Sequence, residues 1–296
     1  MFEQIIGNKK IKEELVASIK KGNISHSYLF LGTQGIGKKM IAKEFAKMIL
    51  CTSENKYCNK CKSCIEFDTN NNPDFSIIEP DGNSIKIDQI REFQKKVSEK
   101  PIISQKKIYI INDSDKMTVE AQNCLLKTLE EPPEFVVIIL IGTNENLFLS
   151  TIKSRCMILH FEQIEEKEIS KYLQENYQIT IKSKNMLNAF QGSIGKALQL
   201  KDKQEQYEKI ENLVNTLEKT DKIDLINNAE FLYSNKEEKT EILDYMEVIL
   251  MNIAKQSNKY AQTIEIIEKT KKRLQANANY DMNIDNMLFE IWEAVN

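Results

Sequence analysis

The segment SYLFLGTQGIGKK, residues 27–39, constrains the fold more than any other part of the chain. Its apolar start predicts a strand over Ser27–Gly32, which leads into a glycine-rich loop and then into a helix from Lys38. In a phosphate-binding loop the backbone N–H groups surround phosphates, the helix N-terminus adds positive potential, and the lysine reaches the β- and γ-phosphates. Four residues have this spacing: Gly32, Gly35, Gly37 and Lys38.

The loop departs from this pattern at its metal-binding end. The position after the lysine should be Ser or Thr, whose hydroxyl ligates Mg²⁺, but the sequence has Lys39, which cannot coordinate a cation. Two interpretations therefore stay open. The loop serves only as a tight strand-to-helix turn, or it binds ATP or ADP without efficient hydrolysis.

Further apolar runs continue this pattern to about residue 161. They are Phe75–Pro80, Lys107–Asn112, Phe135–Gly142 and Cys156–Phe161, each separated from the next by helix-like sequence. Continuous rather than alternating apolar residues are typical of strands buried on both faces, so the fold class is predicted to be α/β, a parallel sheet covered by helices. We expect this nucleotide-binding-like domain to span residues 1–162.

The sequence after residue 162 favours helices. Amphipathic stretches begin at Glu165–Tyr177 and predict a small helical lid domain over 163–203 and an all-helical domain over 204–296. No proline follows Pro133 and no glycine follows Gly195, which agrees with long uninterrupted helices. Because the apolar positions of the last domain exceed what one small bundle needs to hide, we expect it to be an oligomerisation domain.

The end of the third apolar run carries the second nucleotide-related pattern. Asn112 stands where a carboxylate would hold Mg²⁺ through water, and Asp113 stands where a longer glutamate would polarise the attacking water. Because Lys39 and Asn112 weaken binding of the same ion, we expect little ATPase activity. Thr143, after the fourth run, is either a sensor of the γ-phosphate or an ordinary strand-end cap.

A cysteine cluster predicts a metal site. The spacing C-x6-C-x2-C-x2-C, formed by Cys51, Cys58, Cys61 and Cys64, contains two tight pairs that can wrap thiolates around one tetrahedral Zn²⁺. We expect a structural zinc; free reduced thiols are the alternative, and four ligands leave no open position for a catalytic metal. The surrounding segment has three lysines and two acids, a mixed charge that disfavours a DNA-binding zinc element. Cys124 and Cys156 are expected to be small core residues.

Composition excludes several classes of protein. The 41 Lys and Arg residues nearly balance 44 Asp and Glu residues, so a net charge of −3 gives no general attraction to nucleic acid or membrane. We expect a cytoplasmic protein, because no secretory apolar region starts the sequence and nowhere do eighteen apolar residues run together. With His26 and His160 as the only histidines, a His-rich metal site or a His-centred relay has little material.

Arg155 precedes the last apolar run, within Ser154-Arg155-Cys156. A lone arginine is normally a surface charge. Just before a strand of a nucleotide-fold domain, however, it can present its guanidinium to a neighbouring subunit, where a planar and permanently charged donor stabilises a phosphate in transfer.

Together these segments resemble the clamp-loader branch of AAA+ proteins. The resemblance rests on Ile24–Lys38, the four-cysteine insert, Asn72–Glu92, Ala121–Pro133 and Thr151–Cys156. The sequences LLKTLEEPP and SRC are jointly quite specific, and the resemblance covers the first two predicted domains well and the third only by position. In this family the SRC arginine reaches ATP on the adjacent ATPase subunit, so the resemblance assigns Arg155 the role of a trans arginine finger.

The resemblance also implies a non-motor member of the ring. ATPase members carry an arginine in a GSxR motif, whereas this chain has Gly195 there, and the adjacent Lys196 would point elsewhere on a helix. The implied partners are gamma/tau-type ATPase subunits and a delta subunit and, through the complex, a sliding clamp and primed DNA, with no membrane. The alternative is an active AAA+ ATPase, gamma/tau-like or another remodeller, that tolerates Lys39 and Asn112.

Overall fold

The structure, a computed structural model, describes residues 2, 5–54, 56–181, 183–200 and 203–296. The chain forms two compact units. The first comprises residues 1–172 and 192–195, and the second comprises residues 173–191 and 196–296. The predicted division into three domains, with boundaries at 162/163 and 203/204, stays a prediction.

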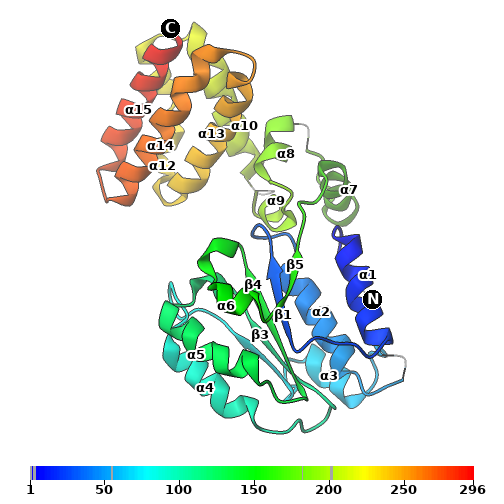
Figure 1. The fold of residues 1–296 in the computed structure, drawn as a ribbon. Helices are drawn as coiled ribbons and strands as arrows, with labels where there is room; N and C mark the ends of the chain where they lie inside the picture. The colour runs from blue at the N-terminus through cyan, green and yellow to red at the C-terminus, as the bar shows by residue number, and fades with distance from the viewer. Residues whose placement is uncertain (1, 3–4, 55, 182, 201–202) are drawn as a thin grey trace. The chain divides into compact units, whose positions relative to one another are not determined.

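The first unit is built around a five-stranded parallel sheet (Figure 1). Its strands, in the spatial order β2-β3-β4-β1-β5, are β1 (Ser27–Leu31), β2 (Phe75–Ile78), β3 (Lys107–Ile111), β4 (Val136–Gly142) and β5 (Met157–His160). Every apolar run that predicted a strand is confirmed as one, and the predicted α/β fold class is confirmed with them. The central strands β1, β3 and β4 are buried along their whole length, which explains their continuous apolar sequence.

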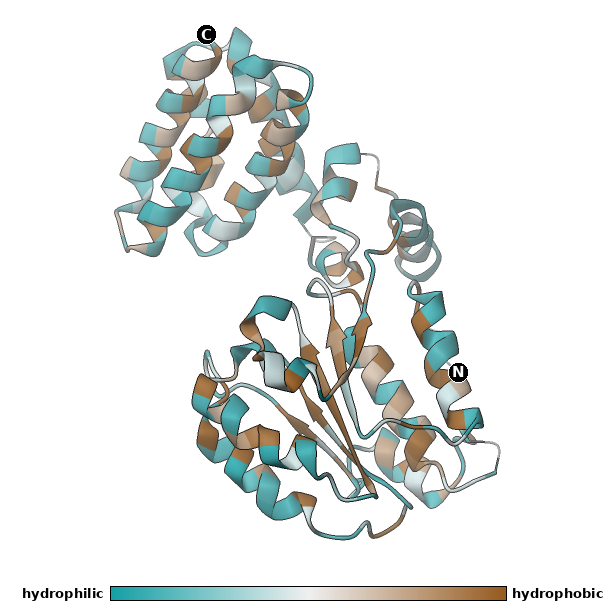
Figure 2. Cartoon of the chain, viewed as in Figure 1, coloured by the Kyte–Doolittle hydropathy of each residue, from teal (hydrophilic) through white to brown (hydrophobic). Residues whose placement is uncertain are grey.

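Two groups of helices cover the two faces of the sheet. One face carries α1 (Lys9–Lys20), α2 (Lys38–Leu50) and α3 (Lys62–Asp68), and the other carries α4 (Ile87–Val97), α5 (Val119–Glu130) and α6 (Ser150–Lys153). Successive strand residues alternate between the two cores: Tyr28 and Phe30 pack toward α2, whereas Leu29 and Leu31 pack toward α5. Figure 2 shows the apolar strands between helices whose outer faces are polar. Each fully buried large apolar side chain contributes about 1.5–3 kcal/mol.

The strand register brings three loops to one edge of the sheet. Leu31 of β1 lies beside Gly142 of β4, and Ile111 of β3 lies beside Leu140. The carboxyl ends of these strands therefore lie together, followed by the glycine loop, by the 3-10 turn η1 (Ser114–Lys116) and by the 3-10 turn η2 (Glu145–Leu147). This edge is where open α/β sheets bind ligands.

The described chain after β5 is helical, as predicted. The helices are α7 (Glu166–Tyr177), α8 (Lys184–Ala189), α9 (Ile194–Leu200), α10 (Gln204–Thr216), α11 (Lys222–Asn228), α12 (Glu230–Ser234), α13 (Lys239–Ala254), α14 (Ala261–Gln275) and α15 (Tyr280–Val295), with the 3-10 turns η4 (Leu217–Lys219), η5 (Lys236–Glu238) and η6 (Asn258–Tyr260).

The core of the second unit lies among α10, α13, α14 and α15, where Ile249, Ile267 and Ile291 are fully buried. Helix α8 packs on α13, and the Asn252 amide nitrogen donates a hydrogen bond to the Asn185 side-chain oxygen at 3.0 Å. In the part of the chain that the structure describes, no helix has both the length and the apolarity to cross a bilayer.

Candidate functional site

The Lys38 ammonium bridges the glycine loop between β1 and α2. Lys38 Nζ donates hydrogen bonds to the carbonyl oxygens of Gly32, at 2.5 Å, and Thr33, at 2.7 Å. The side chain is buried, and burial lowers the pKa of Lys38 to about 8, although the carboxylates of Asp115 and Asp113 oppose the shift. The loop thus has the cationic side chain that phosphate binding requires, at the edge of the sheet where the sequence predicts it.

The turn over Gly192–Gly195 packs directly on this loop. The Gly195 N–H donates to the Gly35 carbonyl oxygen at 3.1 Å. A Cβ atom on Gly35, whose φ is +78°, would lie 2.2 Å from the Ser193 hydroxyl oxygen, and a Cβ on Gly195 would lie 3.0 Å from Gly35 Cα. A side chain at position 195, such as the arginine of the GSxR motif, would therefore require the neighbouring backbone to shift. This close approach is a physical reason for the glycine.

The metal-binding end of the loop offers few oxygen ligands. Lys39 forms an ion pair with Glu79 at 2.5 Å. Asn112 has an amide where a carboxylate would hold Mg²⁺, and its backbone N–H donates to the Ile78 carbonyl oxygen at 2.9 Å. The carboxylate of Asp113 lies 3.1 Å from the ammonium of Lys116. A cation at this edge would thus have to compete with two lysine ammonium groups.

Sequence reasoning did not assign a role to Asp115, which contacts the predicted sensor residue. Its carboxylate accepts hydrogen bonds from the Thr143 hydroxyl at 2.6 Å, the Thr143 N–H at 2.8 Å and the Asn144 N–H at 3.1 Å. Burial alone would raise the pKa of Asp115, but these hydrogen bonds hold the pKa below its usual value. The Thr143 hydroxyl is therefore engaged by the protein. The only sequence signal was the place of Asp115 just beyond Asn112 and Asp113.

The four cysteines of the predicted metal site come together. The sulfur atoms of Cys51, Cys58, Cys61 and Cys64 all lie within 4.8 Å of one another. The Cys51 sulfur lies 3.6 Å from that of Cys58 and 4.0 Å from that of Cys61. A tetrahedron with Zn–S bonds of about 2.3 Å requires sulfur atoms about 3.8 Å apart, so this donor set fits a zinc-sized ion. The cluster can hold a metal ion such as zinc.

Local backbone geometry prepares the cluster for a metal. The N–H groups of Lys60 and Cys61 donate hydrogen bonds to the Cys58 sulfur, at 3.5 and 3.2 Å, and so hold that sulfur in place. Burial raises the pKa of Cys64, and the neighbouring thiols of Cys61 and Cys51 raise it further. Metal binding must therefore displace a proton from Cys64.

A buried polar network supports the cluster from behind. The Ser104 hydroxyl donates to the carbonyl oxygen of Leu50, the residue before Cys51, at 2.8 Å, and lies 3.0 Å from the hydroxyl of Ser63, the residue before Cys64. The fully buried Asp74 carboxylate accepts hydrogen bonds from the N–H groups of residues 102–104 at 2.6–2.8 Å. Nothing in the spacing of the cysteines predicted this network.

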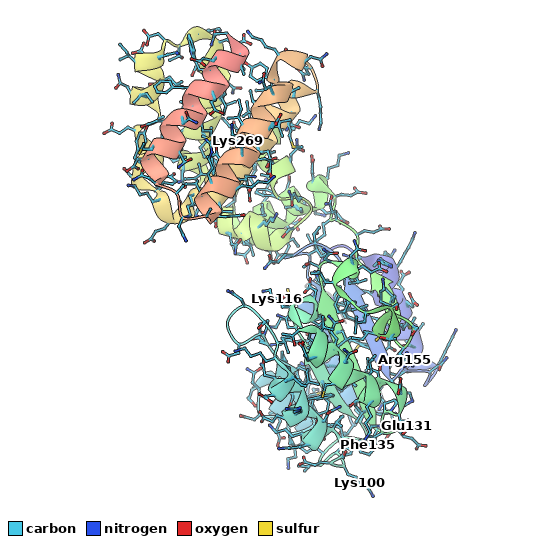
Figure 3. All side chains as sticks on the ribbon, turned by 60° about the vertical axis from the view of Figure 1, so that its left-hand side comes forward. Lys100, Lys116, Glu131, Phe135, Arg155 and Lys269 are labelled. Atoms are coloured by element: carbon cyan, nitrogen blue, oxygen red, sulfur yellow. The ribbon has the colours of Figure 1, made fainter. Side chains whose placement is uncertain are left out.

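Arg155 lies in the turn between α6 and the edge strand β5 and contacts its own unit (Figure 3). One terminal nitrogen lies 2.8 Å from the Glu130 carboxylate. The other donates to the Thr151 carbonyl oxygen at 2.9 Å and to the Ser154 hydroxyl at 3.2 Å. The side chains of Arg155 and Glu130 are 33% and 49% exposed, and a pair this exposed contributes only about 0–1 kcal/mol to folding. The guanidinium is thus oriented while remaining accessible.

Comparison with known proteins identifies the family. The family model described as "DNA polymerase III, delta subunit" matches residues 7–165, which is more than half of the chain. The chain belongs to this family. Residues 7–165 contain the glycine loop, the four cysteines and Arg155, so the family assignment rests on the part of the chain that carries the candidate site.

Relatives within the family and its neighbourhood agree with the resemblance to clamp loaders. The chain is 39% identical over 167 residues to DNA polymerase III subunit delta' of Bacillus subtilis, covering 56% of this chain and 51% of that protein. It is 35% identical over 210 residues to subunit tau/gamma of Haemophilus influenzae, covering 68% of this chain and 30% of that protein. The chain thus spans about half or less of the length of these relatives.

A solved structure supports the fold alone. A DNA polymerase III gamma subunit-related protein from Thermotoga maritima superposes with a TM-score of 0.52 at 20% identity, covering 96% of this chain and 99% of that one.

Within the family fold, the remaining predicted residues take ordinary positions. Cys156 is half-buried, and burial raises the pKa of its thiol to about 12. The Cys124 thiol donates to the Gln94 side-chain oxygen at 3.3 Å on the covered face of α5. Both cysteines are partly buried and pack against the core of the sheet unit, rather than lying within it as expected. His160 is exposed and lies 4.0 Å from Glu145.

Proposed function

We propose that this chain is the non-motor, delta-prime-type subunit of a cytoplasmic DNA polymerase III clamp loader. It assembles with gamma/tau-type ATPase subunits and a delta subunit, and the complex loads a sliding clamp onto primed DNA. One observation carries the proposal. The same unit combines a phosphate-type loop that lacks oxygen ligands for Mg²⁺ with an accessible arginine, Arg155. The names of the relatives, delta' and tau/gamma, support the same assignment.

In this proposal Arg155 acts on ATP that is bound by the neighbouring ATPase subunit. A guanidinium stabilises the negative charge that develops on the γ-phosphate during hydrolysis, and it keeps its own charge at any physiological pH. The chain itself hydrolyses no ATP, because Lys39 and Asn112 replace oxygen ligands suited to Mg²⁺. Its Gly192–Gly195 turn lacks the nucleotide-sensing arginine of the motor subunits.

The four-cysteine cluster holds a structural Zn²⁺ in this proposal. Four thiolates complete a tetrahedral shell, so no position is left for substrate or water, and the ion serves to fold the segment between α2 and α3.

The test of the whole proposal is reconstitution. ATP hydrolysis and clamp loading on primed DNA are measured with gamma/tau-type, delta and clamp proteins, with and without this chain. We expect both activities to depend on the chain, and equal activity without it would refute the proposal.

A second candidate function is an active AAA+ ATPase, and one observation favours it. Lys38 bridges the carbonyl oxygens of Gly32 and Thr33, so the loop keeps the geometry that a bound phosphate requires. The two candidates differ in the isolated chain. Turnover of about 1 per second or more that is abolished by Lys38→Ala would favour the ATPase and exclude the non-motor subunit.

A further inference from the structure

Helix α5 holds the segment that leads to Arg155 at two points. The first is the buried amide of Gln122, 2% exposed. Its nitrogen donates to the Leu147 carbonyl oxygen at 2.9 Å, and its oxygen accepts a hydrogen bond from the Leu149 N–H at 3.0 Å. The segment that leads into α6 thus contacts both polar atoms of this amide. These two hydrogen bonds fix the start of α6 relative to α5.

The second point is Glu130, the last residue of α5. Its carboxylate lies 2.8 Å from Arg155, at the other end of the same segment. A carboxylate at the C-terminal end of a helix faces the negative end of the helix dipole and does not stabilise the helix. The exposed ion pair adds little to folding either. The structural contribution that remains for Glu130 is the orientation of the arginine.

The contacts of Arg155 leave part of its guanidinium available. A guanidinium has five N–H groups, and the contacts with Glu130, Thr151 and Ser154 engage at most three of them. These contacts determine the plane of the group. A donor that is already oriented loses less conformational freedom when it meets a phosphate, and its contribution to catalysis depends steeply on its position.

We propose that Glu130 is a positioning residue that orients Arg155 for the phosphate of the neighbouring subunit, with α5 as the scaffold that holds both ends of the arginine segment. This inference rests on the proposed trans action of Arg155. The positioning role also explains why this chain carries both LLKTLEEPP and SRC, although the two sequences are separated along the chain. LLKTLEEPP supplies the carboxylate, and SRC supplies the arginine that contacts it.

The test uses a pair of matched variants of the full chain. Glu130→Gln removes the charge and keeps the shape of the side chain. The control is Glu131→Gln, which makes the same change at the next residue, an exposed glutamate that forms no ion pair with the described residues. Figure 3 labels Glu131 and Arg155, which lie on the same side of the sheet unit in that view. We expect both variants to keep the melting temperature of the unchanged chain.

The first readout is the order of the Arg155 side chain in the isolated protein, measured by NMR relaxation of its guanidinium nitrogens. Glu130→Gln should lower the order parameter of Arg155, and Glu131→Gln should leave it unchanged. This readout does not depend on ATP or on the other subunits. An Arg155 side chain that stays as ordered in Glu130→Gln as in the unchanged chain would overturn the positioning role.

The second readout is DNA- and clamp-stimulated ATP hydrolysis by the reconstituted complex. We expect Glu130→Gln to lower the turnover number at the site that Arg155 faces by about threefold to tenfold, without a change in assembly, and to have no further effect when combined with Arg155→Ala. An unchanged rate with Glu130→Gln, while Arg155→Ala lowers the rate, would overturn this inference and leave the proposed function intact. An unchanged rate with Arg155→Ala would instead overturn the proposed function and, with it, the purpose assigned to Glu130.

Discussion

The Asp115 carboxylate accepts a hydrogen bond from the Thr143 hydroxyl at 2.6 Å and another from the Thr143 N–H at 2.8 Å. These bonds connect the turn after β3 to the end of β4, at the edge of the sheet that carries the glycine loop. The hydroxyl proton of Thr143, the residue that the sequence offered as a γ-phosphate sensor, is thus directed at Asp115. At this edge of the sheet the turn after β3 and the end of β4 are therefore held together by hydrogen bonds within the chain.

The first prediction concerns the stability that Asp115 provides. Asp115→Asn should lower the free energy of unfolding at pH 7 by about 1–3 kcal/mol, because three hydrogen bonds lose a charged acceptor. The pKa of Asp115 is lowered in the folded state. Its contribution should therefore be complete above the ordinary pKa of 3.8 and disappear as the pH falls below it toward the folded-state value.

Urea unfolding of the unchanged chain and the variant at pH 7 and at pH 3 measures this difference. Asp113→Asn is the control, because among the described residues the Asp113 carboxylate pairs only with the exposed Lys116. Equal destabilisation by the two variants at pH 7 would contradict the role of Asp115.

The second prediction is that protein purified without chelator contains about one equivalent of zinc per chain. Replacing Cys58 by Ser should reduce this content and loosen the segment between α2 and α3, whereas Cys124→Ser should not change it. Because the thiols must lose protons to bind the ion, zinc should be released as the pH is lowered. Elemental analysis and thiol titration measure both effects, and less than half an equivalent at intact thiol content would count against the site.

The third prediction is negligible ATP hydrolysis by the isolated chain. ADP that binds through the loop should do so independently of Mg²⁺, and more weakly as the pH rises through about 8, where Lys38 loses its charge. The double variant Lys39→Thr with Asn112→Asp restores two oxygen ligands and should make binding depend on Mg²⁺. Isothermal titration with and without Mg²⁺ measures this, and a strong Mg²⁺ requirement in the unchanged chain would argue for a motor subunit.

The fourth prediction is that the helical C-terminal region mediates assembly. Truncation near Lys203 is a poor test, because it would remove α13, on which α8 packs, and would expose the core of the second unit. Substitution of exposed apolar residues is cleaner. Ile223 on α11 and Met282 on α15 are 74% and 71% exposed, so serine at either position should change monomer stability by less than about 0.5 kcal/mol.

We expect Ile223→Ser with Met282→Ser to weaken association with the other subunits. Asp224→Ser, at an exposed polar position of the same helix α11, should leave it unchanged. Affinity is measured by analytical ultracentrifugation with gamma/tau-type and delta subunits. Unchanged affinity in the double variant would show that these residues lie outside the assembly surface.

The sequence was sufficient for features that depend on local patterns. The strands follow from continuous apolar runs, because a strand covered on both faces has no polar side. The four-cysteine cluster follows from its spacing, since cysteines separated by two residues can direct their thiolates to one point. Both signals lie within short segments, and no knowledge of tertiary contacts was needed to find them.

Features that join distant segments were missed. The hydrogen bond between Gly195 and Gly35 spans 160 positions, and the ion pair between Glu130 and Arg155 depends on how α5 and α6 pack. Asp115 carries no motif of its own and gains its role only from the parallel register of β3 and β4. The sequence marked Arg155 and the LEEPP segment separately, but only the structure shows that they contact each other.

In the proposed function, Arg155 acts on ATP that is bound by a neighbouring subunit. The most direct test is the rate of DNA- and clamp-stimulated ATP hydrolysis by the complex reconstituted with Arg155→Ala or Arg155→Lys. A finger of this kind contributes ~10³-fold or more at its own site, so the site that Arg155 faces should lose nearly all activity and the whole complex a part of it. Lysine should rescue poorly, because a point charge does not reproduce the planar fork. Folding, zinc content and assembly should stay normal in both variants despite this loss. A complex that assembles normally with Arg155→Ala and keeps its full stimulated rate would contradict this role of Arg155.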